Sequence, residues 1–377
     1  MTSPITARIA GGVVDLPADQ WDALTDGGNP FMRHAFLAAL ERSGSVGGRS
    51  GWIPVPLTIE AKDGRLAAAL PAYLKQHSQG EYVFDHAWAD AWQRAGGHYY
   101  PKLQIAAPFT PATGPRLLTC DPALAAPLLR AAEKLCELHR LSSAHATFVE
   151  PAQVPQFEAA GWLIRSDIQF HWHNRGYASF DDFLAQLSSR KRKAIRKERT
   201  AAQAGVRIEA LVGNAIKPQH WEAFWEFYQD TGSRKWGRPY LTREAFDLFG
   251  ATMGDDIVLV LALVGDTPIA GALNFLGTEA LYGRYWGCIV DKPMLHFELC
   301  YYQAIEIAIA RGLARVEAGA QGPHKLSRGY EPVKTWSAHW IADPGFREAV
   351  ADFLERERAG VDAEQAFLGE RVPFRKA

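Results

Sequence analysis

Residues 256–332 constrain the fold more than any other stretch of the chain. At their start lies the run DDIVLVLALV (255–264), whose apolar part is long enough for a buried strand and too short to cross a membrane. Two further strand candidates follow, and the pair Asp291 and Pro293 marks the start of a helix over about 294–311. Gly312 ends that helix, and a returning strand leads into a polar loop. This order predicts a mixed α/β unit in which the helix packs on a sheet.

The first half of the chain repeats the same order of elements. A predicted hairpin over 52–74 precedes a helix from Asp121 to about His139, and strand, short helix and strand follow up to Asn174. The sequence therefore predicts an α+β fold with two pseudo-equivalent domains. We expect a first domain over 1–177, a basic helical segment over 178–205, and a second domain with a C-terminal helix over 206–377.

Length and composition agree with two globular domains. The chain has 377 residues, twelve tryptophans and a formal net charge of −1, so it has ample core and no global attraction to nucleic acid or to an anionic membrane. Its four cysteines lack C-x-x-C spacing, which argues against a zinc site or a disulfide framework. We find no basic leader and no run of roughly 20 apolar residues, and we expect a cytoplasmic protein without a transmembrane segment.

The segment SFDDFLAQLSSRKRKAIRKERTAAQA is the strongest local electrostatic feature. Ser179 is a helix cap, and the helix after it carries cations offset only by Glu198. Such a run is usually a solvated helix face, but here the rest of the chain is net acidic, which makes the run a patch. We interpret it as a phosphate-binding surface for a nucleic-acid backbone or a pyrophosphate. Its candidate residues are Arg190, Arg192, Lys193, Arg196 and Lys197.

Residues 80–116 have the most unusual composition. Aromatic side chains including Trp88 alternate with charged ones, and the loop Pro-Ala-Thr-Gly-Pro-Arg closes the segment at Arg116. One interpretation is a helix whose aromatics fill the gap between two domains; the other is a pocket wall, with Arg116 presented to an anion. Both interpretations remain open from the sequence.

His171 and His173 alternate along a predicted strand and so share one face. They could ligate a metal, but no carboxylate or cysteine stands beside them at ligand spacing. We therefore favour two ordinary histidines on a half-exposed face and predict no metal site.

Several enzyme classes lack their signals in this chain. It contains no G-x-S-x-G elbow, no Walker loop and no strand followed by G-x-G-x-x-G. A serine hydrolase, an NTPase and a dinucleotide-dependent dehydrogenase are disfavoured.

Four long segments resemble a known bacterial family. They are GEYVFDHAWADAW, HYYPKLQIAAPFTPATGPRLL, SSRKRKAIRKER and HFELCYYQAIEIAIARGLARVEAGAQGPHKLSRGYEPV. The chain resembles, from about residue 50 to 345, the predicted N-acyltransferases related to the FemAB proteins, often described as peptidoglycan biosynthesis or recognition proteins. The resemblance implies a tandem pair of GNAT-like domains. It also implies transfer of an acyl group to an amine, from aminoacyl-tRNA as in FemAB relatives or from acyl-CoA as in ordinary GNAT domains.

That reaction suggests which residues to examine. The stretch Gly287 to Pro293 stands where acyl-CoA enzymes carry a basic residue followed by G-x-G/A, which disfavours acyl-CoA. Acyl transfer needs a neutral amine, a polarised carbonyl and a protonated leaving group. The candidates for proton handling are Glu298, His296, Tyr285 and His324, with a pocket expected between Arg284, Glu298 and His324. Glu298 is equally well explained as a carboxylate that compensates the helix dipole. The candidates for substrate binding are Arg284, Trp236, Arg238, Lys325, Arg328, Trp88 and Arg116.

The donor would be a co-substrate, and we expect no tightly bound cofactor. The acceptor would be an amine, such as that of a cell-wall precursor. Two other hypotheses remain. The chain could be a non-catalytic tandem GNAT protein that binds tRNA or a cell-wall precursor, or a nucleic-acid-binding module built on residues 190–199 alone.

Overall fold

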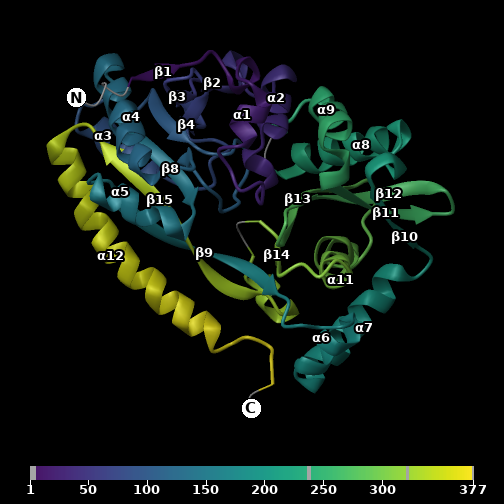
Figure 1. Ribbon diagram of the computed structural model, residues 1–377. Coiled ribbons are helices and arrows are strands. Elements are labelled where there is room, and N and C mark those ends of the chain that lie inside the picture. The colour runs from purple at the N-terminus through teal and green to yellow at the C-terminus, as the bar shows by residue number, and fades with distance from the viewer. Residues whose placement is uncertain (1–5, 236–238, 320–321, 376–377) are drawn as a thin grey trace. The chain divides into compact units, whose positions relative to one another are not determined.

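A computed structural model describes residues 6–235, 239–319 and 322–375 (Figure 1). The chain forms two compact units, one of residues 1–167 and 334–363, the other of residues 168–333 and 364–377. These bounds differ from the predicted ones, because the chain leaves the first unit inside strand β9 (Leu163–His173) and returns through β15 (Glu331–Ile341). Strand β9 contains no glycine or proline, so the sequence gives no sign of the first crossing. The basic segment belongs to the second unit.

The first unit has two sheets. The smaller is antiparallel, in the order β1 (Ala7–Ile9), β3 (Leu57–Glu60), β4 (Leu66–Leu70), β7 (Leu118–Thr119). The larger runs β15, β8 (Ser143–Val149), β6 (Lys102–Ile105), β5 (Ala72–Lys75), β2 (Trp52–Pro54), and only β6 and β8 are parallel. The helices of this unit are α1 (Ala18–Asp22), α2 (His34–Arg42), α3 (His86–Arg94), α4 (Ala125–His139), α5 (Val154–Ala159) and the first part of α12 (Pro344–Gly369).

The two faces of the larger sheet differ in chemistry. On one face, Leu103, Ile105, Ala144 and Ala146 join the core beside α4. The alternate residues of the same strands are polar, and yet they are buried as well: Lys75, Lys102, Gln104, His145 and His339. A buried polar face is costly unless its groups bond to one another.

The second unit contains one mixed sheet. Its order is β10 (Arg207–Val212), β11 (Ile257–Val264), β12 (Thr267–Leu276), β13 (Ala280–Cys288), β14 (Arg315–Glu317), β9, and only β13 and β14 are parallel. Its helices are α6 (Phe180–Gln186), α7 (Ser189–Gln203), α8 (Pro218–Lys235), α9 (Arg243–Met253), α10 (Leu295–Phe297) and α11 (Gln303–Ala310). The predicted mixed α/β organisation with two units is confirmed.

The helix expected over 294–311 is not uniform. Between α10 and α11, residues Glu298–Tyr302 form a π turn, and the helix begins at Met294 in the left-handed conformation. The apolar pattern of this segment fits an uninterrupted helix equally well, so the sequence gives no signal for the turn. Single π turns inside helices often occur at functional sites.

None of the helices in the three described ranges has the length and apolar character needed to cross a bilayer.

Candidate functional site

The two parallel strands of the second unit pair over only part of their length. β13 and β14 pair only from Ala280 to Tyr282 and from Arg315 to Glu317; β14 then ends, whereas β13 continues to Cys288. On the other edge of β13 the register with β12 shifts, because Leu273 opposes Tyr285 and Asn274 opposes Gly283. Arg284 is therefore the extra residue of a β-bulge. Bulges re-aim side chains beside active sites.

A pocket of about 110 Å³ lies where the strands separate. Its walls come from β12, β13, α10, the π turn and the residue after β14. The lining residues are Ala272, Leu273, Asn274, Gly283, Arg284, Tyr285, Trp286, His296, Cys300, Tyr301 and Ala318. Three predicted site residues, Arg284, Tyr285 and His296, are thus brought together.

The π turn supplies a hydrogen-bonded pair to this pocket. Tyr301 lines it, and the Tyr301 hydroxyl lies 3.0 Å from Nε2 of His324. Burial raises the pKa of Tyr301, while partial burial and the nearby Arg328 and Lys325 lower the pKa of His324. At neutral pH the phenol therefore keeps its proton and the imidazole is uncharged. Such a pair can pass a proton between the pocket and the exposed imidazole.

Asn274 brings an open acceptor to the pocket wall. Its side chain is 1% exposed, and its Nδ2 donates to the carbonyls of Val258 (3.2 Å) and Ala272 (3.3 Å). Its Oδ1 has no hydrogen-bond partner among the described residues. A buried acceptor left in this state costs free energy, so the site is suited to a ligand that carries an N–H donor.

Glu298 lies elsewhere than expected. It does not line the pocket; its fully buried carboxylate accepts hydrogen bonds from Arg199 (2.9 and 3.1 Å), Gln203 (2.9 Å) and Gln303 (2.8 Å). The pocket expected between Arg284, Glu298 and His324 is therefore bounded differently, with His324 behind Tyr301. The carboxylate of Glu298 therefore joins α7 to α11 and does not face the pocket.

The predicted substrate-binding residues Lys325 and Arg328 lie near the pocket without lining it. Lys325 is buried, donates to the carbonyl of Gly319 (2.8 Å), and has a pKa lowered by burial to about 8. Arg328 donates to Glu198 (2.9 Å) and to the carbonyl of His324 (2.9 Å). The predicted residues Trp236 and Arg238 lie outside the described residues.

Arg116 and Trp88, predicted to contact substrate, are interior residues of the first unit. Arg116 is 0% exposed and donates to the carbonyls of Thr147 (2.8 Å) and Ala112 (2.9 Å), so its guanidinium is enclosed by backbone and cannot meet an external anion as expected. Trp88 packs edge-on against His339 at 4.9 Å between ring centroids, and Arg165 lies over its ring. Trp88 therefore packs inside the first unit, and neither expected role, filling a gap between two domains or lining a pocket, describes it.

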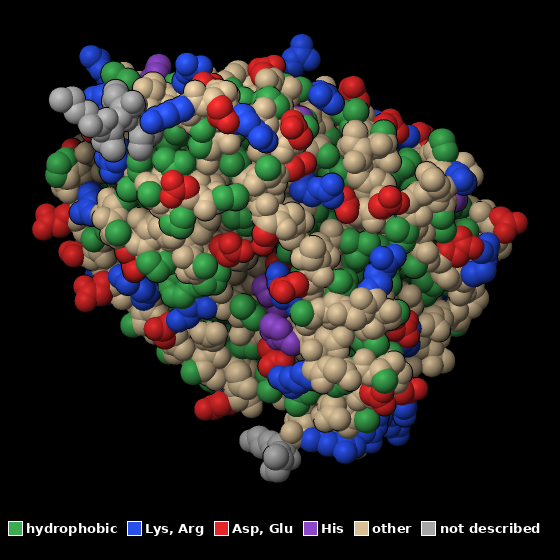
Figure 2. Space-filling view, viewed as in Figure 1, with side chains coloured by type: hydrophobic (Ala, Val, Ile, Leu, Met, Phe, Trp, Pro, Cys, Tyr) green, Lys and Arg blue, Asp and Glu red, His purple; other side chains and the backbone are tan. Residues whose placement is uncertain are grey.

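The basic helix α7 displays most of its cations. Figure 2 shows Lys and Arg side chains gathered at the lower edge of the molecule, where Figure 1 places α6 and α7. Of the predicted phosphate-binding residues, Arg190, Lys193, Arg196 and Lys197 are exposed and Arg192 is half-buried. Arg196 pairs with Asp181 (2.8 Å), and no ion pair within the described ranges engages the other four.

Comparison with known proteins identifies the family. The family model of the FemAB-like proteins, described as peptidoglycan biosynthesis/recognition, matches residues 12–376. This chain belongs to the FemAB-like family. No curated protein sequence matches it significantly.

Solved structures show the fold of this FemAB-like protein. FemX is similar with a TM-score of 0.54 and 12% identity, over 89% of this chain and 98% of FemX. The C-terminal domain of a protein assigned as lysylphosphatidylglycerol synthetase from Agrobacterium fabrum is similar with a TM-score of 0.52 and 9% identity, over 89% of this chain and 95% of that domain. L-PGS from Bacillus licheniformis has a TM-score of 0.51 and 8% identity, over 88% and 98%. The predicted tandem GNAT-like fold is confirmed.

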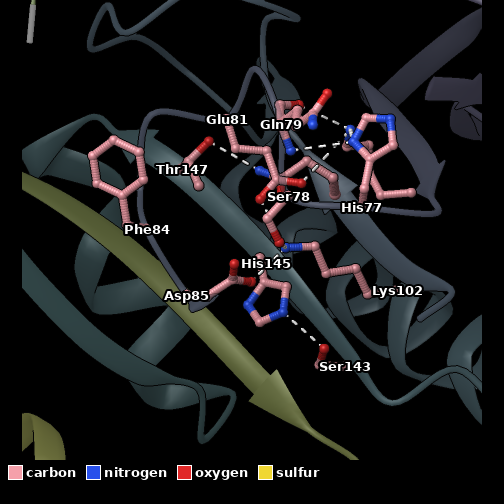
Figure 3. A network of polar contacts seen from close by, with 12 residues as sticks. His77, Ser78, Gln79, Glu81, Phe84, Asp85, Lys102, Ser143, His145 and Thr147 are labelled. Atoms are coloured by element: carbon pink, nitrogen blue, oxygen red, sulfur yellow. Dashed lines mark hydrogen bonds and ion pairs between the residues drawn. The ribbon is translucent and has the colours of Figure 1, made fainter. Parts of the chain in front are cut away.

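Sequence reasoning missed a buried polar network in the first unit of the FemAB-like protein (Figure 3). Lys102 donates to Asp85, to Glu81 (2.7 Å) and to Ser78 (2.9 Å), and Asp85 also accepts from the Tyr99 hydroxyl (2.7 Å). Although burial opposes ionisation, Glu81 and Asp85 raise the pKa of Lys102, and Lys102 lowers the pKa of Asp85. We find Lys102 held charged between two carboxylates.

The network extends along the polar face of the sheet. The Nδ1 atoms of His145 and His339 are 2.7 Å apart, and burial lowers the pKa of His145 to about 3. Burial also lowers the pKa of Lys75 to about 7 and raises that of Glu81 to about 7. The alternation of polar and apolar residues along these strands was readable in the sequence, but it is equally typical of a solvent-exposed face.

The expected half-exposed face is wrong for His171, which is buried beside Glu317, with Nε2 and a carboxylate oxygen 3.8 Å apart. The described residues contain no group of three His, Cys, Asp or Glu side chains arranged for a metal ion.

Proposed function

We propose that this protein is an N-acyltransferase that moves an aminoacyl group from aminoacyl-tRNA to an amine, and that the reaction takes place in the pocket of the second unit. The observation that carries the proposal is the opening between β13 and β14, which combines an unfilled acceptor, Asn274, with the proton-transferring pair Tyr301 and His324. Family membership supports a transferase acting in peptidoglycan biosynthesis.

The chemistry requires only modest help from side chains. The amine nitrogen attacks the ester carbonyl, a C–N bond forms, and the C–O bond to the tRNA breaks. The amine loses one proton, and the departing ribose oxygen gains one. Asn274 Oδ1 would accept a hydrogen bond from an N–H of the bound aminoacyl group, Arg284 would polarise the ester carbonyl, and His296 or Tyr301 would carry the proton. Orientation supplies much of the remaining acceleration.

The size of the pocket favours a small acyl group. About 110 Å³ is less than the engineered cavity of about 150 Å³ that holds benzene in another protein. A small aminoacyl group is of this scale.

The exposed cations of α7 favour a polyanionic carrier. Four side chains, those of Arg190, Arg192, Lys193 and Lys197, have no ion pair with any described carboxylate, so they remain available to phosphates. The name of one structural neighbour, lysylphosphatidylglycerol synthetase, describes a product in which an amino acid is joined to a lipid. A tRNA donor also places the reaction in the cytoplasm.

The family description suggests the acceptor. We propose an amine of a peptidoglycan precursor, because the family is described by peptidoglycan biosynthesis or recognition. The word recognition leaves a rival, a protein that binds tRNA or the precursor without chemistry. The pocket of the second unit favours the enzyme, since pure recognition does not require a hydrogen-bonded Tyr301–His324 pair at the pocket wall.

The test is a transfer assay with a tRNA pool charged with labelled amino acids and a mixture of amine-bearing peptidoglycan precursors. We expect label to move from tRNA to precursor only when the protein is present, and Tyr301→Phe to slow transfer by about 100-fold. Transfer from acyl-CoA alone would refute the proposed donor. Saturable binding of both substrates without product under any amino acid would favour the binding protein.

A further inference from the structure

Helix α7 reaches inward through two adjacent residues of opposite charge. Arg199 bridges Glu298, the first residue of the π turn, and Glu306 of α11, which follows the turn. Its Nη1 and Nη2 lie 2.8 and 2.9 Å from the two oxygens of Glu306, and its Nη2 and Nε lie 2.9 and 3.1 Å from those of Glu298. One guanidinium therefore spans the wide turn from end to end.

Loss of this ion-pair bridge would strongly destabilise the fold around it. Glu298 is 0% exposed, and a buried carboxylate is strongly destabilising when it loses its partner. The carboxylates outweigh burial and raise the pKa of Arg199, so the guanidinium stays charged. A bidentate fork fixes orientation as well as distance, which a lysine ammonium cannot do.

The π turn needs such support because its geometry is uncommon. Its five residues include Cys300 and Tyr301, both of which line the pocket. If the turn relaxed to an ordinary α-helical turn, the side chains on one side of it would rotate relative to those on the other, because an α-helical turn holds fewer residues than a π turn. The contents of the pocket therefore depend on the turn.

The neighbouring residue Glu198 connects α7 to the end of the π turn and to the segment that carries His324. It accepts hydrogen bonds from Tyr302, the last residue of the π turn, and from Arg328. Arg328 in turn donates to the carbonyl of His324 (2.9 Å), and the His324 ring bonds to Tyr301. Both members of the proton-transferring pair are thus tied to α7.

We propose that Arg199, assisted by Glu198, is the positioning residue of the pocket: it holds the π turn so that Cys300 and Tyr301 face the bound acyl group. This inference rests on the proposed function only for the identity of that group. It assigns a second role to the basic helix, whose outer face offers charge to phosphates while its inner face sets the geometry of the site.

Thiol labelling tests the inference without any assay of transfer. In a protein with Cys120→Ser and Cys288→Ser, the remaining cysteines are Cys300 in the pocket and the buried Cys136 of the first unit. We expect Arg199→Met to accelerate labelling of Cys300 by a small thiol reagent about tenfold, since local opening of the turn loses its charged hydrogen bonds. Arg199→Lys should fall between Arg199→Met and the unsubstituted background. Labelling of Cys136 should stay slow.

The matched control is Arg196→Met, which removes a cation from the exposed face of the same helix. It should label like the background protein. An unchanged Cys300 rate in Arg199→Met, or an equal acceleration in Arg196→Met, would overturn the inference. If Arg199→Met does not fold, Glu306→Gln decides: it removes the half-exposed arm of the bridge and should still speed labelling about threefold, and an unchanged rate would refute the bridge.

Transfer assays then separate this inference from the proposed function. If the wild-type protein transfers aminoacyl groups, Arg199→Lys should lower kcat and leave KM for the donor nearly unchanged, because the residue does not touch the donor. If the wild-type protein transfers nothing, the proposed function fails, and the labelling rates still decide whether Arg199 positions the π turn.

Discussion

The two units share one topological feature, a parallel strand pair, but differ in what lies beside that pair. Each contains one parallel strand pair joined through a helix, β6 and β8 in the first unit and β13 and β14 in the second. In the second unit the strands separate after Tyr282 and Glu317, and a pocket opens. In the first unit the chain itself occupies the corresponding place: Gly114 forms a bridge to Val149.

The segment around Gly114 in the first unit is hydrogen-bonded to β8 and to the residue that follows it. The amide of Gly114 donates to the carbonyl of Phe148 (3.1 Å), its carbonyl accepts from the amide of Glu150 (3.2 Å), and the Arg116 guanidinium reaches Thr147. The two units therefore share a scaffold, and a short segment of chain determines which of them keeps an opening between its parallel strands.

The largest effect should come from the buried polar face of the first unit. Lys102→Met would leave Glu81 and Asp85 buried without their cation, and we expect the free energy of unfolding of the first unit to fall by about 3–5 kcal/mol. Protection of the buried Cys136 thiol in increasing urea measures this. Lys134→Met, which breaks an exposed pair with Glu137, is the control and should cost about 0.5 kcal/mol or less. Equal effects of the two substitutions would show that the network does not hold the unit together.

Filling the open pocket should abolish transfer without unfolding the protein. In Ala318→Trp an indole would occupy the space needed by the acyl group, and we expect transfer to fall at least about 100-fold. Ala178→Trp adds the same indole at an exposed position of the same unit and should transfer normally. Circular dichroism verifies folding of both variants, and undiminished transfer by Ala318→Trp would move the reaction out of this pocket.

Gly114 in the first unit and Gly283 in the second both follow the paired residues of the first parallel strand, so substitutions there compare the two units directly. In Gly114→Ala the new methyl would lie 2.2 Å from Nδ2 of Asn29, so we expect a loss of about 1–3 kcal/mol in stability of the first unit with little effect on kcat. In Gly283→Ala the nearest atom, Asn274 Oδ1, lies at 3.5 Å, an ordinary contact. That variant should keep its stability and lose activity, because the methyl enters the pocket. Urea midpoints and kcat, measured on both, would contradict the comparison if the two variants behaved alike.

The smallest effect concerns pH. Burial lowers the pKa of Lys75 to about 7, whereas the unfolded chain has the ordinary value of about 10.5. The folded unit therefore binds fewer protons in this window, and stability rises with pH above 7, by at most about 1.4 kcal/mol per pH unit. Urea unfolding of the first unit at pH 7, 8 and 9 should show this slope in the wild type and a flatter one in Lys75→Met. Parallel slopes would mean that Lys75 stays charged in the folded protein.

The sequence predicts the scaffold better than the site. Strand patterns and the repeat of elements predicted two α+β units, and polar residues at the end of β13 drew attention to Arg284 and Tyr285, which line the pocket. The π turn was not predictable, because its residues have the same apolar character as an α-helix. Asn274 and Tyr301 were missed for a related reason: their positions in the pocket wall depend on a bulge and on that turn.

The charge of a side chain was the least reliable predictor of whether it is exposed. Arg116 follows a loop that looks suited to an anion, yet backbone carbonyls surround it. Lys75 and Lys102 stand in strands as if exposed, although they are fully buried. A sequence shows that a residue is charged but not whether a partner far along the chain will neutralise it, as Glu81 and Asp85 do for Lys102.

The most direct test is a crystal structure of the protein with a non-hydrolysable donor analogue, an adenosine whose 3′ position carries an amide-linked amino acid. We predict that the aminoacyl group occupies the pocket between β13 and β14, with its ammonium near Asn274 Oδ1 and its carbonyl near Arg284. An analogue bound to the first unit, with the pocket of the second unit vacant, would contradict the account.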